Sequence, residues 1–175
     1  MFKDTEIRPI YFLILVIIIY LVLLLPTVGL YGIYYDEQTD MDIARSYISQ
    51  PSGWLNGSSS DPANVRLPMY FVAIIFTMFK TESLFAARLV NCFLGVLILV
   101  GVFAYCKRQH DRKTGILACL ILATSPYFLS FSRIALTESD IFIACALVWL
   151  LVCLSILLKK RTVGWAGVSA VLLQV

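Results

Sequence analysis

The sequence of 175 residues is 60% hydrophobic and only 14% charged. Soluble domains carry roughly a quarter charged residues and under half apolar ones, so this composition excludes a disordered chain, a collagen-like repeat and an ordinary soluble domain. It favours a chain that lies largely in lipid. The net charge of +3 is small, and we therefore expect no nucleic acid among the partners.

Four apolar segments are long enough to cross a bilayer, whose core of about 30 Å needs about 20 helical residues. These spans cover about residues 10–30, 83–106, 115–132 and 141–158, and a fifth begins at 163 and is incomplete at 175. We therefore predict an all-α, polytopic transmembrane protein with four full spans and the start of a fifth. Because half a span is a poor natural terminus, we expect residues 1–175 to be the N-terminal part of a larger membrane module.

The apolar segment 67–79 is too short for a comfortable crossing, since a helix of this length covers only roughly 20 Å. Basic residues occur at 3–8, 107–113 and 159–161. If segment 67–79 does not cross, all three groups fall on one side, as the positive-inside rule requires of the cytoplasmic side. We therefore expect a cytoplasmic N-terminus, a plasma (inner) membrane location and an outer loop 31–82 with interfacial helices.

Carboxylates concentrate on the outer side, where two of the spans leave the membrane. Asp36 opens a predicted helix after the first span, and Glu138 and Asp140 lie between the third and fourth spans. A carboxylate in such a place can act as a general base or hold a divalent cation. For each cluster alone, helix capping is the simpler interpretation, and an Arg133–Glu138 ion pair is a further one.

Taken together, the two acidic clusters favour chemistry, because both lie at the same face of neighbouring helices and could converge over one cavity. Arg66, Lys80, Arg88 and Arg133 would lie nearby as ligands for an anion. Acids and cations at the outer face suit a lipid-linked phosphate substrate. The acids would activate an acceptor hydroxyl, and the cations would hold the phosphate leaving group.

An ordered set of motifs then resembles a known family over roughly residues 8–160. Tyr-Asp-Glu at 35–37 opens the outer-loop helix, Arg-Leu-Pro-Met-Tyr-Phe follows at 66–71, and Phe-Ala-Ala-Arg-Leu-Val at 85–90 leads the second span. Ser-Pro-Tyr-Phe-Leu-Ser-Phe-Ser-Arg-Ile-Ala-Leu-Thr-Glu completes the set at 125–138. In this topology the motifs resemble the N-terminal part of GT-C glycosyltransferases of the protein O-mannosyltransferase and aminoarabinose transferase group.

The resemblance implies an integral membrane enzyme that transfers a sugar from a polyprenyl-phosphate donor to a lipid, glycan or protein acceptor at the extracytoplasmic face. Asp36 and Glu138 match the two acidic positions of the family and are the expected catalytic residues, with Asp140 as the fallback for Glu138. The resemblance leaves open a divalent cation, held by Asp36 and Glu138, as the sole cofactor. Arg66 is the nearest match to the basic residue that contacts the lipid phosphate. The residues expected to bind substrate are Glu37, Arg66, Tyr70, Arg88, Arg133 and Asp140.

Two other classes of function compete with a glycosyltransferase. A transporter or flippase subunit would place ionisable residues in the middle of its spans, whereas the predicted span interiors here are nearly free of charge. A non-catalytic truncated paralogue is the other alternative, and the incomplete fifth span keeps it open. The expected partners are the polyprenyl-phosphate sugar donor, membrane lipid and an unidentified acceptor.

Overall fold

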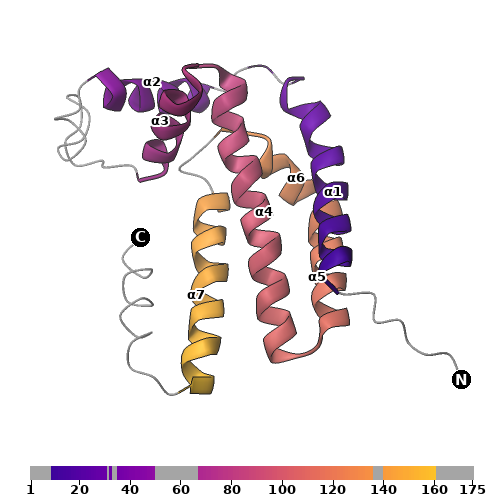
Figure 1. Ribbon diagram of the computed structural model, residues 1–175. Coiled ribbons are helices and arrows are strands. Elements are labelled where there is room, and N and C mark those ends of the chain that lie inside the picture. Colours follow the sequence, from indigo (N-terminus) through magenta and orange to yellow (C-terminus); the bar gives the residue numbers. More distant parts are fainter. Residues whose placement is uncertain (1–8, 31, 33–34, 50–66, 136–139, 161–175) are drawn as a thin grey trace, which may run out of the picture.

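The computed structural model describes residues 9–30, 32, 35–49, 67–135 and 140–160, and this part of the chain consists of helices without a strand (Figure 1). The prediction of an all-α protein is confirmed. In chain order the helices are α1 (Pro9–Val28), α2 (Tyr35–Ser49), α3 (Leu67–Phe79), α4 (Leu84–Gln109), α5 (Arg112–Thr124), α6 (Pro126–Ser132) and α7 (Asp140–Lys160).

Three of these helices, α1, α4 and α7, are long and apolar enough to cross a membrane. They coincide with the spans predicted at 10–30, 83–106 and 141–158. Their outward faces carry large apolar side chains, among them Val22, Phe93 and Leu147, of which more than half of the surface is exposed. A helix that is apolar on its outer face as well as its inner one is typical of a membrane span.

The third predicted span, 115–132, is not one continuous helix in the structure. The structure breaks it into α5 and α6, whose axes differ by 67°. Pro126 causes the break, because proline lacks an N–H and disfavours the helical conformation of the residue before it. Ser125 is accordingly extended, and its hydroxyl accepts a hydrogen bond from Phe128 N to cap α6. The described chain therefore has three straight spans, and a fourth only if the bent pair crosses as one unit.

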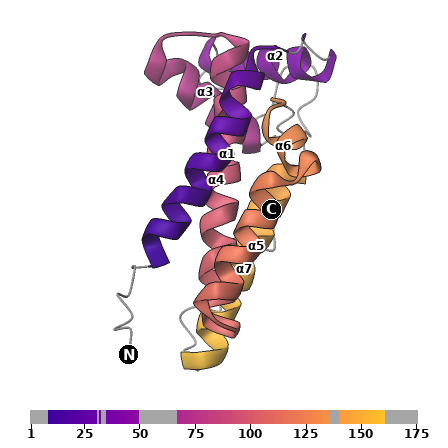
Figure 2. The ribbon, with the colours of Figure 1, turned by 90° about the vertical axis from the view of Figure 1, so that its right-hand side faces the viewer.

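Helix α4 is the central element, and it packs against α1, α3, α5, α6 and α7. Helices α2, α3 and α6 gather at one end of the bundle, beside the first residues of α4 and α7 (Figures 1 and 2). The last residues of α4 and α7 lie at the opposite end, together with the start of α5. Lys107, Arg108, Arg112 and Lys113 lie at this opposite end, which we call the basic end. Segment 67–79 forms the short helix α3 and packs on α2 and α4, at the end away from the basic residues.

The packing of α1 on α4 depends on a glycine. Tyr20 of α1 is fully buried, and its hydroxyl donates a hydrogen bond to the Cys92 carbonyl oxygen at 3.4 Å. A Cβ at Gly95 would lie only 1.9 Å from that hydroxyl oxygen. Only glycine leaves room at this position for the Tyr20 ring. Gly95 therefore determines how closely α1 and α4 approach.

We expect Gly95→Ala to destabilise the fold by about 1–2 kcal/mol, because overpacking costs about 1–3 kcal/mol and exceeds the gain in helix propensity of at most about 1 kcal/mol. Unfolding by titration with a denaturing detergent measures this change. Tyr20→Phe removes the nearest clashing atom and should restore part of the loss. Gly29→Ala, which meets nothing within 4 Å, is the control and should change stability by less than about 0.5 kcal/mol. A Gly95→Ala protein as stable as wild type would contradict the close α1–α4 contact.

A tight turn at the basic end joins α4 to α5, and Asp111 caps α5 within it. Asp111 has an extended backbone, and its carboxylate accepts a hydrogen bond from Thr114 N at 2.6 Å. This bond, together with a bond to the Thr114 side chain, holds the pKa of Asp111 below its ordinary value of 3.8. A carboxylate with a lowered pKa in the folded state stabilises the fold above its unfolded-state pKa, and this contribution is lost as the pH falls through the folded-state pKa.

We expect Asp111→Ala to be less stable than wild type at neutral pH and to converge on wild type in acid, below the ordinary pKa of 3.8. Unfolding measured from neutral to acid pH checks this. Asp111→Asn keeps a capping oxygen without a titrating group, so it should stay close to wild type at neutral pH. If the difference in stability between wild type and Asp111→Ala did not depend on pH, the charge of the Asp111 carboxylate would have no part in the cap.

Candidate functional site

The acidic helix α2 turns two carboxylates into the protein. Glu37 and Asp40 are buried, with 0% and 4% of their surfaces exposed, and Met41 and Ala44 lie buried on the same side of the helix. Met41 and Ala44 thus give the helix a buried apolar side. Asp36 lies in the first turn of α2, but its side chain lies outside the described part of the structure.

Glu37 forms a buried ion pair with Arg88 of α4. The Arg88 Nε donates to Oε1 of Glu37 at 2.9 Å and Nη2 donates to Oε2 at 2.8 Å, so the fork of the guanidinium meets both carboxylate oxygens. Only 1% of the Arg88 side chain and 0% of the Glu37 side chain are exposed. A charge buried in a membrane span needs such a partner, because neither lipid nor the apolar core can solvate it.

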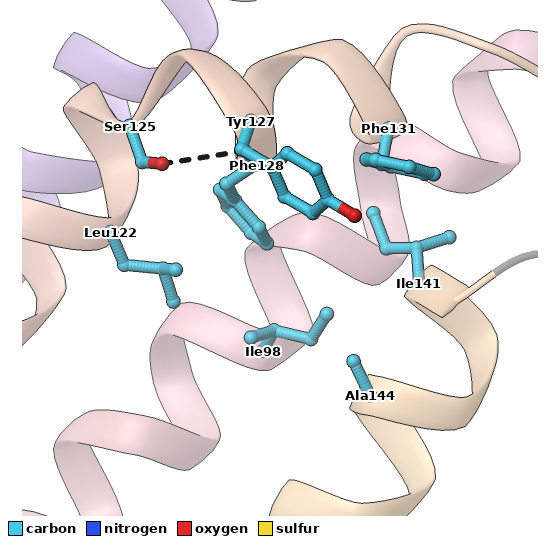
Figure 3. Close-up of a pocket in the computed structure, with 8 residues that line it drawn as sticks. All are labelled: Ile98, Leu122, Ser125, Tyr127, Phe128, Phe131, Ile141 and Ala144. Atoms are coloured by element: carbon cyan, nitrogen blue, oxygen red, sulfur yellow. Dashed lines mark hydrogen bonds between the residues drawn. The ribbon is translucent and has the colours of Figure 1, made fainter.

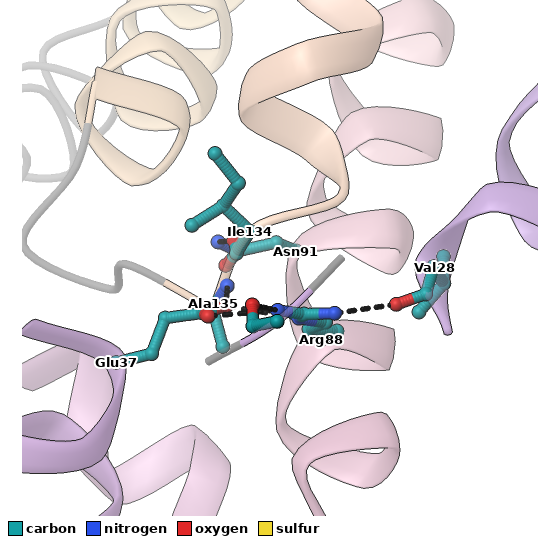
Figure 4. Close-up of polar contacts among 7 residues, drawn as sticks. Val28, Glu37, Arg88, Asn91, Ile134 and Ala135 are labelled. Carbon is teal, nitrogen blue, oxygen red and sulfur yellow. Dashed lines mark hydrogen bonds and ion pairs between the residues drawn. The ribbon is translucent and has the colours of Figure 1, made fainter. Parts of the chain in front are cut away.

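The same arginine also binds the end of α1. Its Nη1 donates to the Val28 carbonyl oxygen at 2.6 Å, and Nη2 donates to the Gly32 carbonyl oxygen at 2.9 Å (Figure 4). The last carbonyl groups of a helix have no partner within the helix and attract cations. Arg88 thus connects the end of α1 to the start of α2.

A third segment is bound to the same pair. The backbone N–H of Ala135, which follows α6, donates to Oε1 of Glu37 at 2.6 Å. Next to it, the side-chain amide of Asn91 donates to the carbonyl oxygen of Ile134 (Figure 4). We call Glu37, Arg88, Asn91 and the backbone of residues 134–135 the anchor cluster. It joins parts of the chain that are far apart in sequence at the end of the bundle opposite the basic end.

The remaining predicted site residues fall into two groups. Arg66 and Glu138 lie outside the described residues, as does the side chain of Asp140, so the expected approach of Asp36 and Glu138 stays a prediction. Tyr70 of α3 stacks on Tyr47 of α2, with ring centroids 4.5 Å apart and planes 11° apart. Burial and the neighbouring Tyr47 raise the pKa of Tyr70, which keeps its phenol neutral.

Arg133 ends α6 and is only partly buried. Its Nε donates to the Leu129 carbonyl oxygen at 3.1 Å within the same helix. This bond turns the side chain back along α6, while the backbone of Arg133 directly precedes residues 134–135 of the anchor cluster. Its expected role as a ligand of the substrate phosphate stays a prediction.

Sequence reasoning missed two residues that make polar contacts at this end of the protein. Asn91 is an amide inside an otherwise apolar span, and this isolated polar group was the available signal. Arg45 donates from Nε to Glu82 at 3.1 Å and from Nη1 to Asp42 at 2.7 Å, and so holds α2 to the segment before α4. Neither partner of Arg45 follows from a local pattern that marks a site.

In the part of the chain that the structure describes, no group of three or more His, Cys, Asp or Glu side chains could hold a metal ion. The proposed ligands Asp36 and Glu138 are not among the side chains described. The divalent cation therefore stays a prediction.

An apolar cavity of about 160 Å³ opens at the break between α5 and α6 (Figure 3). Its lining comes from α4, α5, α6 and the start of α7, namely Ile98, Leu122, Ser125, Tyr127, Phe128, Phe131, Ile141 and Ala144. A dry apolar cavity of this size accommodates a group about as large as benzene. Short segments of a hydrocarbon chain would fit it, and charged groups would not.

The comparisons with known proteins identify the family. The family model described as dolichyl-phosphate-mannose-protein mannosyltransferase matches residues 66–174, more than half of the chain. The matched part includes Arg88, Asn91 and residues 134–135, whereas α1 and α2 with Asp36 and Glu37 precede it. No curated protein and no solved structure matches the chain. The resemblance to membrane glycosyltransferases is thus confirmed at the level of the family, and with its three apolar spans the chain is an integral membrane protein that belongs to the dolichyl-phosphate-mannose-protein mannosyltransferase family.

Proposed function

We propose that the protein transfers a sugar, with mannose as the first candidate, from a polyprenyl-phosphate donor to an acceptor hydroxyl. The observation that carries this proposal is the hydrogen bond from Ala135 N to Glu37. It ties the start of α2, where Asp36 lies, to the segment that leads to Glu138. A fully extended chain covers at most roughly 3.6 Å per residue, so Glu138 lies within roughly 11 Å of Ala135.

In the proposed reaction Asp36 acts as the general base and takes the proton of the acceptor hydroxyl. The hydroxyl oxygen then bonds to the anomeric carbon of the sugar, and the bond from that carbon to the phosphate oxygen breaks. Polyprenyl phosphate leaves with the electron pair, and Arg66 and Arg133 would stabilise its charge. Glu138 would assist either as a second acid-base group or, with Asp36, as a ligand of a divalent cation.

The apolar cavity at the α5–α6 break supports a lipid-linked donor. Its lining residue Ile141 directly follows Asp140, a predicted substrate-binding residue, in the chain. A donor with a charged phosphate and an apolar tail needs an apolar surface next to a polar one. The cavity provides the apolar surface, and Arg66 and Arg133 are the proposed polar partners of the phosphate.

We expect Asp36→Asn to lower the transfer rate by at least about 100-fold while membrane insertion stays intact, because a positioned general base contributes about 10²–10⁴-fold. Membranes that contain the intact protein would be incubated with radiolabelled polyprenyl-phosphate mannose, with and without EDTA. Asp42→Asn is the matched control, because Asp42 is exposed and its ion pair with Arg45 lies at the surface; its rate should stay within about twofold of wild type. Wild-type rates in Asp36→Asn would remove Asp36 from the mechanism, and a wild-type protein that consumes no polyprenyl-phosphate sugar would refute the proposed function.

We further propose that the anchor cluster faces the extracytoplasmic side of the plasma membrane and the basic end faces the cytoplasm. The positive-inside rule supports this orientation, because the exposed Lys and Arg residues of the α4–α5 turn lie opposite α2 and α3.

Cysteine labelling in intact cells tests the orientation. In a background without the native cysteines, Glu82→Cys at the α2–α3 end should react with a membrane-impermeant maleimide. Lys113→Cys at the basic end should react only after the cells are opened. The reverse pattern would invert the proposed topology.

A further inference from the structure

We propose that the buried Glu37–Arg88 pair is a positioning element, which sets the distance between the start of α2 and the segment after α6 and does not itself bind substrate. This inference rests on the proposed function, because it assigns a role to the two residues within the same site. It replaces the expectation that Glu37 and Arg88 contact the substrate directly.

The occupancy of the Arg88 donors argues against a role in binding phosphate. A guanidinium has five N–H donors, and at least four of those of Arg88 are used in bonds to Glu37, Val28 and Gly32. With 1% of its side chain exposed, Arg88 offers no surface to a ligand. A phosphate could reach it only if the protein gave up several charge-assisted bonds, which are about twice as strong as neutral ones.

The pair is also an unusual way to obtain stability alone. Taking two charges out of water is costly, and apolar side chains of similar volume often stabilise a fold equally well. What an apolar pair cannot provide is direction: the fork of Arg88 fixes the carboxylate of Glu37, and that carboxylate fixes the backbone N–H of Ala135 at 2.6 Å. The distinctive contribution of the pair is therefore geometric.

This geometry acts on the proposed reacting groups through very short chain segments. Asp36 is the neighbour of Glu37, and Glu138 follows Ala135 within roughly 11 Å. An error of about 1 Å in the placement of a catalytic group can cost about 10²-fold in rate. Loosening the pair should thus lower kcat and leave the KM for the donor nearly unchanged, because no contact with the donor is removed.

The test uses conservative variants that keep both charges. Glu37→Asp shortens the carboxylate arm by one methylene, and Arg88→Lys replaces the fork by a single ammonium group. We expect each to lower kcat at least about tenfold, with the KM for polyprenyl-phosphate mannose within about twofold of wild type. Arg45→Lys is the matched control, since Arg45 also holds α2 through an ion pair but is 38% exposed; its kcat should stay within about twofold.

A distance measurement provides a readout that does not depend on activity. Spin labels would be placed at Gln38→Cys on α2 and Ser130→Cys on α6, after the five native cysteines are replaced. We expect a narrow distance distribution in the otherwise wild-type protein, a broader or shifted one in Glu37→Asp and Arg88→Lys, and no change in Arg45→Lys.

Each result decides between the alternatives. A raised KM with unchanged kcat would show that the pair binds substrate, and a loss of stability alone, with unchanged kcat and distances, would show a purely structural role; either overturns the inference. A distance distribution that is unchanged while kcat falls would overturn it as well. If the wild-type protein shows no turnover, the proposed function fails, and the spin-label distances still decide whether the pair sets the position of α2 relative to α6.

Discussion

The end of the bundle that holds the candidate site depends on one requirement, which is that the positive charge of Arg88 be neutralised inside an apolar helix. Lipid cannot solvate a guanidinium, so the protein must supply both an anion and hydrogen-bond acceptors. Glu37 supplies the anion, and the carbonyl groups of Val28 and Gly32 supply acceptors. Since these partners come from the end of α1, from Gly32 and from the start of α2, satisfying one charge also connects α1 to α2.

Hydropathy predicted most of this architecture and failed where backbone chemistry overrides it. The spans that became α1, α4 and α7 follow from long apolar runs, and segment 67–79 forms a shorter apolar helix, as its length predicted. The run 115–132 is also apolar and carries no charge, and an average over such a window does not register a single proline. The break was nevertheless encoded locally, since Ser125 followed by Pro126 is a strong signal for a new helix start.

The sequence was sufficient to predict charged residues of the candidate site, but not which of them bind each other. Residue type and membrane face were sufficient to select Glu37 and Arg88, yet they are 51 positions apart, and no local pattern indicates that they bind each other. Adjacent acids on a helix point about 100° apart, so a helix turns only one of two neighbouring acids toward a given partner. Which of the two neighbouring acids faces the core depends on the rotation of α2 about its axis, and that rotation follows from Arg88.

The position of the charges also bears on the choice between an enzyme and a transporter. A translocation path needs ionisable groups near the membrane midplane that exchange partners during the cycle. Within the described helices, Arg88 lies in the second turn of α4 and is held on several sides at once, so it is suited to fixing a structure and not to carrying a charge across it. The middle of α4 instead presents Ile98 to an apolar cavity. The buried charge is thus fixed at one end of the bundle, and the middle of α4 lines an apolar cavity instead of a charged path, which favours an enzyme over a transporter.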